Sequence, residues 1–182
     1  MRSRALPWLV LVACCSCGND GTRESVAVDF ATMSDSAKVL LIDEIPIGLT
    51  AAQVRERIPT LPPLKRYVAD HLQQVSMPVT LFDRSAELTF NFEDSVLYGY
   101  YYDGDLCWPV SEADSILERV SDRLSSRFGR FIYEQEANHP YDLVYHKWQA
   151  EGFDALTTMS LRGERNCIAL SYQVPLSTAL TQ

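Results

Sequence analysis

Residues 86–92 read AELTFNF, and residues 96–102 read VLYGYYY, with a short polar turn between the two segments. In the first segment Leu88, Phe90 and Phe92 alternate with polar residues. This period of two predicts a strand that buries one face. The second segment follows after the turn, so together they predict an antiparallel β-hairpin. We therefore expect the protein to be built around an antiparallel sheet.

Further strands are predicted on both sides of this hairpin. Short runs rich in β-branched and aromatic residues, bounded by turn residues, occupy residues 131–135, 143–149, 155–161 and 167–173. Before the hairpin, the apolar run AKVLLI at residues 37–42 predicts another short strand. The sheet is thus expected to draw on residues from most of the chain.

Three helices are predicted from periodicity and capping signals. The first begins at Thr50, which forms a capping box with Gln53. The second covers residues 64–75, where apolar side chains recur at helical spacing. The third begins with Ser111 as its N-cap and ends before Gly129. All three are amphipathic, which suits helices that pack on a sheet.

The order of these elements predicts an α+β fold. We expect a single antiparallel sheet of about six or seven strands, with two or three helices on one face. The chain has 182 residues, which suits one domain at residues 37–176 and a tail at 177–182. Each half carries a capped helix followed by strands, so a degenerate two-half duplication is a further hypothesis.

The N-terminus predicts export. Arg2 and Arg4 precede an apolar run at residues 5–13, which is far shorter than the roughly 20 residues that span a bilayer. The run ends in LVAC at residues 11–14, which resembles the bacterial lipobox. The resemblance implies that residues 1–13 are a signal peptide and that Cys14 carries the lipid. The alternative is an ordinary secretory signal that is cut nearby.

Residues 14–36 are polar and small, and they are expected to be the lipid anchor and a flexible tether. Cys15 follows the lipid cysteine where enterobacterial sorting to the inner membrane uses Asp, which favours the outer membrane by analogy. Cys15 and Cys17 could be acylated, could pair with each other, or could do neither. Membrane contact is expected through the lipid on Cys14.

Cys107 and Cys167 are the remaining cysteines, and the exported compartment is oxidising. A pair in an exported domain predicts a disulfide bond. A Cys–His metal site is the weaker alternative because no Cys-x-x-Cys spacing occurs. No cofactor is implied by any motif.

Net charge and composition limit the kinds of binding partner that we expect. The formal net charge is −8, and charged residues make up 22% of the chain against 47% hydrophobic residues. An acidic surface repels phosphate backbones, so a nucleic-acid partner is disfavoured. The composition is that of an ordinary globular protein.

A second resemblance rests on the segment IGLTAAQV at residues 47–54, behind a lipobox and a tether and ahead of a hairpin. It resembles the small lipoprotein subunit of the outer-membrane β-barrel assembly machinery and the helix-plus-sheet repeats of secreted β-lactamase inhibitor proteins. By pattern the match extends over residues 45–102. Pro59 and a Pro-Pro pair depart from it, because those modules usually turn there with Gly. The resemblance implies a non-enzymatic binding or scaffold module with a protein partner in the envelope.

The tyrosine-rich strand is the first candidate site. Tyr98, Tyr100 and Tyr102 share one face, which is a binding face if it stays open and core if the strand is covered on both sides. Hairpin pairing that is symmetric about Asp94 would bury Tyr98 and Tyr100 and leave Tyr101 exposed. A shift of one residue would turn them to solvent.

The second candidate is a set of polar residues near the C-terminal strands. His139, Asp142 and His146 could converge as a metal site or as the catalytic residues of a lipid-anchored hydrolase. The odd spacing of the histidines places them on opposite faces of any continuous strand. No known catalytic motif is present, so the sequence favours a non-enzymatic protein and keeps the hydrolase as the alternative.

Overall fold

The computed structural model describes residues 26–136, 143–150, 153–162 and 165–173. The predicted signal peptide at 1–13, Cys14 and the predicted tail at 177–182 lie outside these residues. The described part has an α+β fold with one main antiparallel sheet, as the sequence predicts.

The first part of the chain contributes the helical elements α1 (Asp35–Val39), η1 (Leu41–Asp43) and α2 (Ala51–Arg57), then the strands β1 (Lys65–Tyr67), β2 (Ala69–Leu81), β3 (Arg84–Glu93) and β4 (Val96–Gly104). The second part contributes β5 (Cys107–Pro109), α3 (Val110–Phe128), β6 (Ile132–Glu136), β7 (Leu143–Ala150), β8 (Phe153–Arg162) and β9 (Arg165–Gln173).

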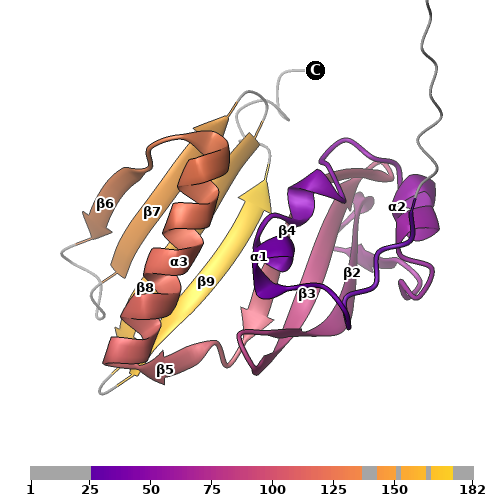
Figure 1. The fold of residues 1–182 in the computed structure, drawn as a ribbon. Helices are drawn as coiled ribbons and strands as arrows, with labels where there is room; N and C mark the ends of the chain where they lie inside the picture. Colours follow the sequence, from indigo (N-terminus) through magenta and orange to yellow (C-terminus); the bar gives the residue numbers. More distant parts are fainter. Residues whose placement is uncertain (1–25, 137–142, 151–152, 163–164, 174–182) are drawn as a thin grey trace, which may run out of the picture.

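The strand order is β1-β2-β3-β4-β9-β8-β7-β6, with β5 pairing beside it on β9. All pairs are antiparallel. Each half is therefore a meander of four strands, and the two last strands, β4 and β9, join the halves (Figure 1). The sheet has nine described strands where about six or seven were expected, because β1, β2 and β5 were not predicted as strands, whereas residues 37–42, predicted as a strand, are helical.

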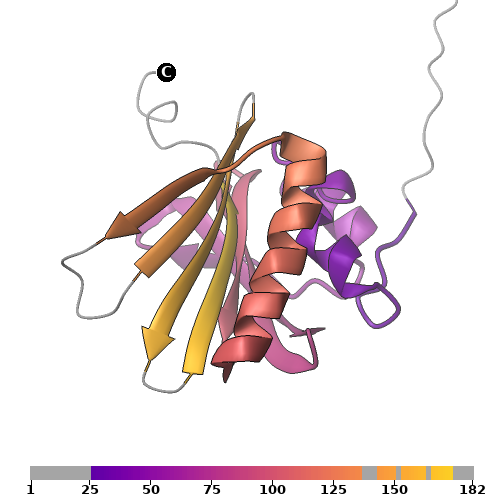
Figure 2. The ribbon, with the colours of Figure 1, turned by 60° about the vertical axis from the view of Figure 1, so that its left-hand side comes forward.

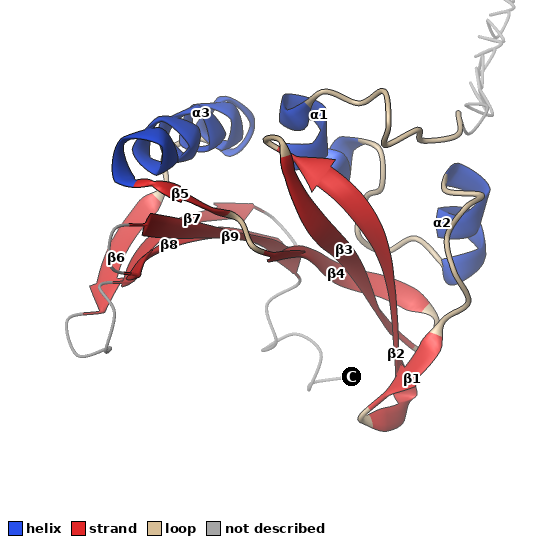
Figure 3. Ribbon diagram, turned by 90° about the horizontal axis from the view of Figure 1, so that it is seen from below, coloured by secondary structure: helices blue, strands red, loops and turns tan. Residues whose placement is uncertain are grey.

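The helices lie on one side of the sheet. Figure 2 shows α3 crossing in front of the strands, and Figure 3 shows α1, α2 and α3 above a sheet that runs beneath them. One core fills the space between these layers, with the apolar sides of β2, β3, β4 and β9 below it. The predicted placement of helices on one face is confirmed.

Helices α2 and α3 begin in different ways. Thr50 caps α2, and its capping box with Gln53 is present as predicted. Helix α3 begins one residue before Ser111, with Pro109 as its N-cap and no side-chain cap bond. The predicted Ser111 cap is therefore wrong. A buried stripe that includes Ile116, Val120 and Leu124 faces the sheet.

Two predicted elements have the wrong type. Residues 37–42 form α1 and η1, because a short apolar run does not distinguish a strand from a buried helix and Ser34 caps the helix. Residues 64–75 form β1 and the start of β2. Val68, expected on the apolar face of a helix, is 88% exposed and has a φ of 58°, which breaks any helix there. From Val75 onward, β2 buries every second residue.

The packed structure begins before residue 37. Val28, Phe30 and Met33 pack against the core, and the Val28 amide donates to the Arg57 carbonyl at 2.6 Å. Part of the predicted tether, residues 28–36, therefore belongs to the folded domain.

Candidate functional site

Strand β4 meets β3 with one bulge, and the bulge decides where the tyrosines lie. A turn at 94–95, with positive φ at both residues, closes the hairpin. The register then shifts by one residue, so that Tyr100 opposes Phe90 and Tyr102 opposes Leu88. Neither of the two registers considered from the sequence is present over the whole hairpin.

Tyr100 and Tyr102 belong to the core, with exposed fractions of 1% and 3%. The Tyr100 ring centroid lies 5.8 Å from that of Phe90 and 4.9 Å from that of Tyr172. The predicted binding face of Tyr98, Tyr100 and Tyr102 is therefore wrong, because β4 lies in the middle of the sheet with its helix-facing side covered.

Tyr98 is the extra residue at the bulge, and its side chain is half-buried. Burial raises the pKa of its hydroxyl, and the nearby Glu93, Tyr67 and Tyr101 raise that pKa further. Tyr98 is therefore not a core residue in the way that Tyr100 and Tyr102 are.

Opposite the helices, the central strands carry a polar network. The Gln74 amide donates to Asn91 Oδ1 at 3.2 Å and to the Tyr101 hydroxyl at 3.1 Å. The hydroxyls of Ser76 and Thr89 bond at 2.9 Å. We call Gln74, Ser76, Thr89, Asn91 and Tyr101 the open face, in which Thr89 is 3% exposed and the other four side chains are half-buried. None of the three described helices covers it (Figure 3).

Of the proposed hydrolase residues, His139 and Asp142 lie outside the described residues. His146 lies on β7 and faces α3, where its Nδ1 hydrogen-bonds with the Ser121 hydroxyl at 2.8 Å. The Phe131 ring stacks on the imidazole, with centroids 4.2 Å apart and planes 14° apart. Burial lowers the pKa of His146 below 6.5, so the neutral imidazole predominates at neutral pH.

The Ser121–His146 contact packs a helix on a strand. Ser121 is only 6% exposed, so a substrate has no direct approach to its hydroxyl. One turn further along α3, the Ser125 hydroxyl accepts a hydrogen bond from the Trp148 indole at 3.1 Å. Two serines of α3 thus fix two aromatic side chains of β7, and this accounts for His146 without catalysis.

Cys107 and Cys167 form a disulfide, with their Cα atoms 4.0 Å apart. The two residues are direct partners in the pairing of β5 with β9. The predicted disulfide is therefore confirmed. It joins the start of the α3 segment to the strand at the centre of the sheet.

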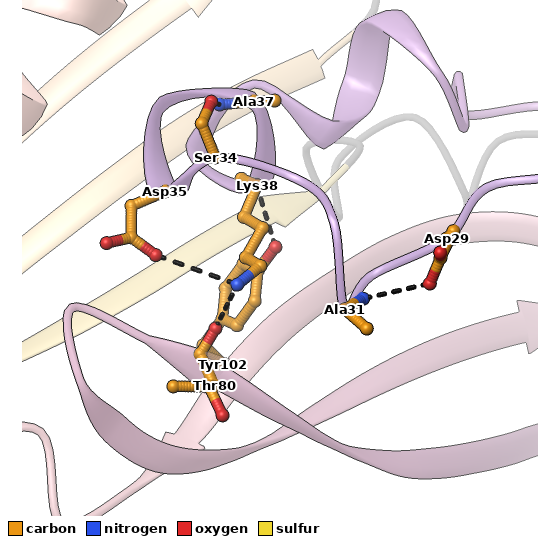
Figure 4. A network of polar contacts seen from close by, with 8 residues as sticks. All are labelled: Asp29, Ala31, Ser34, Asp35, Ala37, Lys38, Thr80 and Tyr102. Atoms are coloured by element: carbon orange, nitrogen blue, oxygen red, sulfur yellow. Dashed lines mark hydrogen bonds and ion pairs between the residues drawn. The ribbon is translucent and has the colours of Figure 1, made fainter.

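A buried cation lies on the helix side of the sheet. Lys38, on α1, is 5% exposed, and its ammonium donates to the Thr80 carbonyl (Figure 4). The Asp35 carboxylate lies 3.6 Å from the ammonium, which is an ion pair longer than a hydrogen bond. The Tyr102 hydroxyl donates to the Lys38 carbonyl at 2.7 Å.

The Thr80 carbonyl is free for this bond because of the neighbouring turn. Phe82 and Asp83 both have positive φ and close β2 on β3, so that Leu81 pairs with Arg84. In an antiparallel ladder the next residue, Thr80, then directs its N–H and C=O away from β3. Lys38 caps this edge of β2.

Within the described ranges, no helix is long and apolar enough to cross a membrane. In the same residues, no group of three or more His, Cys, Asp or Glu side chains is placed to hold a metal ion.

The fold and these sites define an α+β protein with a disulfide, a polar sheet face that no described helix covers, and a buried lysine. Comparisons with protein-family models, with curated proteins and with solved structures found no match.

Sequence reasoning missed Lys38 and Ser121. The sequence did contain a signal for Lys38, because it is a lysine within the apolar run AKVLLI. A charged residue there needs polar partners when the run is buried. Ser121 has no comparable signal, because serine is common on helix surfaces.

Proposed function

We propose that this chain is an exported, lipid-anchored protein of the bacterial envelope that acts as a non-enzymatic binding or scaffold module. The observation that carries the proposal is the Cys107–Cys167 disulfide. Such bonds persist in oxidising compartments and are rare in the reducing cytosol. The signal-like residues 1–13 and the lipobox that ends at Cys14 support the same destination.

The lipid on Cys14 is the proposed membrane contact, with the outer membrane as the proposed destination. Residues 15–27 then remain as the tether between the lipid and the first core residue, Val28. A flexible chain of this length spans roughly 20 Å, which holds the domain close to the membrane surface.

The open face is the proposed binding surface for a protein of the envelope. Tyr101 offers an aromatic ring with a polar tip, a combination that is enriched at protein interfaces. The half-buried Gln74, Ser76 and Asn91 side chains surround it with polar groups that are held in place by hydrogen bonds. The net charge of −8 disfavours a nucleic-acid partner.

The anchor is tested by changing Cys14 to Ser and following the chain in membrane fractions of a host that labels lipoproteins with palmitate. We expect the variant to lose the label and to leave the detergent phase, or to stop maturing. Ser16→Ala is the matched control and should behave like wild type. A mature Cys14→Ser chain that stays bound to the membrane would contradict the anchor.

The binding surface is tested by co-purification of the acylated protein from its own envelope. Tyr101→Arg introduces a bulky charge into the open face, whereas Glu118→Arg places the same side chain on the exposed side of α3. We expect the first variant to lose the co-purifying protein and the second to keep it. Equal recovery with both variants would argue against the open face.

A further inference from the structure

A cavity in the described part of the molecule lies between the N-terminal segment, α1 and the β2–β3 hairpin. It has a volume of about 470 Å³, and its walls come from three segments. The N-terminal segment contributes Phe30 and Ala31, α1 contributes Lys38, and the β2–β3 hairpin contributes Thr80 and Ser85. Pockets of about 300 to 1,000 Å³ are the usual size for small ligands.

Lys38, which lines the cavity, is 5% exposed and is the one buried charged residue among those whose burial is described. An ammonium has three N–H donors. One donates to the Thr80 carbonyl, and the Asp35 carboxylate stands beyond hydrogen-bonding distance at 3.6 Å. The ammonium therefore retains donor capacity toward the cavity that it lines.

Burial of a cation with unused hydrogen-bond donors costs desolvation free energy, and a bound anion would offset that free energy. Removal from water weakens the solvation of the ammonium, and one carbonyl with one long ion pair replaces it only in part. The rest of the lining is mixed, with Phe30, Pro78 and Val79 on the apolar side and Thr80 and Ser85 on the polar side. One positive charge beside these apolar residues suits a ligand with one negative end and an apolar body.

We propose that this cavity binds a small amphipathic monocarboxylate, with the Lys38 ammonium as the counter-ion of the carboxylate. The apolar part of the ligand lies against Phe30 and Val79. Asp35 competes with the ligand for the same ammonium, so the site binds weakly until that carboxylate moves away. This site is independent of the open face and of the proposed protein partner.

The structural reading of Lys38 is that it only fastens α1 to the edge of β2. That reading explains the bond to Thr80 but not the cavity beside it. The two readings differ in what they expect of Asp35. A ligand site predicts that Asp35→Asn tightens carboxylate binding, whereas a mere fastening predicts no carboxylate binding at all.

The test is calorimetric titration of the full chain with octanoate, with octanol as the uncharged counterpart. We expect wild type to bind octanoate at one site and more tightly than octanol. Lys38→Gln should weaken octanoate binding by about tenfold or more, because a charge-assisted hydrogen bond is lost. Asp35→Asn should bind octanoate more tightly than wild type does. Lys65→Gln, which removes an exposed lysine on β1, should bind like wild type.

Lys38→Gln could lose binding because it fails to fold, so a second variant that keeps Lys38 is needed. Ala31→Trp fills the cavity from its exposed rim and leaves the bonds of Lys38 in place. It should abolish octanoate binding while its unfolding transition stays cooperative. Wild type that binds octanoate no better than octanol would overturn the proposal. So would folded Ala31→Trp or Lys38→Gln chains that bind octanoate as wild type does.

Discussion

The two halves of the sheet are secured in different ways. Over β2, β3 and β4 the cover consists of three short helical pieces, of which the longest, α2, has seven residues. Over the second half, one helix of 19 residues, α3, covers β7 and β9. The halves have matching strand meanders that meet at β4 and β9, yet different covers.

This difference shows what a short helix needs. Helices of one or two turns are unstable alone, so α1 and α2 rely on side-chain bonds at their ends in addition to packing. In the first half, Ser34 and Thr50 cap α1 and α2, and Lys38 ties α1 to β2. In the second half, the apolar stripe of α3 suffices, and the covalent bond of Cys107 with Cys167 holds the chain where the helix begins.

The largest expected effect comes from the second half. Replacing Cys107 and Cys167 together by Ser opens a loop with a sequence separation of 60 residues. We expect the free energy of unfolding to fall by about 4 kcal/mol, because the unfolded chain regains the entropy that the bond removes. Guanidinium unfolding of the variant and of oxidised wild type measures this difference. A loss below about 1 kcal/mol would mean that α3 and β9 do not rely on the bond.

The caps of the two halves should respond differently to the same change. Thr50→Ala removes the capping-box bonds of α2 and should lower the free energy of unfolding by about 1 kcal/mol. Ser111→Ala lies in the first turn of α3 but removes no cap bond, so it should change stability by less than about 0.5 kcal/mol. Urea unfolding compares the two variants, and equal losses would contradict the contrast between the helices.

Two buried tyrosines of β4, in the first half, differ in whether the hydroxyl has a hydrogen-bond partner. Tyr102→Phe removes the hydrogen bond to the Lys38 carbonyl and should cost about 1 kcal/mol. The Tyr100 hydroxyl is buried without a hydrogen-bond partner among the described residues, so Tyr100→Phe should be neutral or stabilising. Thermal unfolding of both variants compares their losses of stability. A larger loss for Tyr100→Phe than for Tyr102→Phe would refute this prediction.

The smallest expected effect is a pH dependence of the unfolding free energy, and it arises from His146 in the second half. Burial lowers the pKa of His146 from 6.5 in the folded chain, so the unfolded chain takes up a proton at a higher pH. This contribution to stability is complete above pH 6.5 and is lost as the pH falls through the lowered folded value. His146→Gln keeps a polar group beside Ser121 and does not titrate. Urea midpoints from about pH 7.5 to about pH 5 should decline less in the variant than in wild type. The same decline in both would contradict the assignment.

The sequence predicted the elements whose pattern is long or unambiguous. The alternation of Leu88, Phe90 and Phe92 predicted β3, and the stripe through Ile116 and Val120 predicted α3. Both patterns extend over several turns or residue pairs, so a chance match is rare. The count of cysteines predicted the disulfide, because Cys107 and Cys167 are the only two outside the predicted anchor region.

The failures come from short patterns and from tertiary context. The spacing of Leu64, Val68 and Leu72 matched a helix by chance, since the local backbone is extended and Val68 adopts a positive φ. The bulge in β4 could not be read from VLYGYYY, and it moves Tyr100 and Tyr102 to the core side. The cavity at Lys38 depends on chain segments that are distant in sequence, which no local pattern reports.

The symmetrical strand order bears on the hypothesis of duplicated halves. Helical elements followed by a four-stranded meander occur twice, and the meanders join through their last strands. This is the arrangement that a duplication would produce. The unlike covers, α1 with α2 against α3, show how far two such halves would have diverged, and the duplication stays a hypothesis.

Export to an oxidising compartment can be tested through the redox state of Cys107 and Cys167 in intact cells. Cells are quenched in acid, the protein is denatured, and free thiols are alkylated before mass analysis of the peptides. We expect one disulfide-linked pair that carries no alkyl group, in a mature chain whose first residue is Cys14. Cys107→Ser serves as the control, in which Cys167 should become fully alkylated. If wild type instead carries alkyl groups on both Cys107 and Cys167, the protein folds in a reducing compartment and the proposed function is wrong.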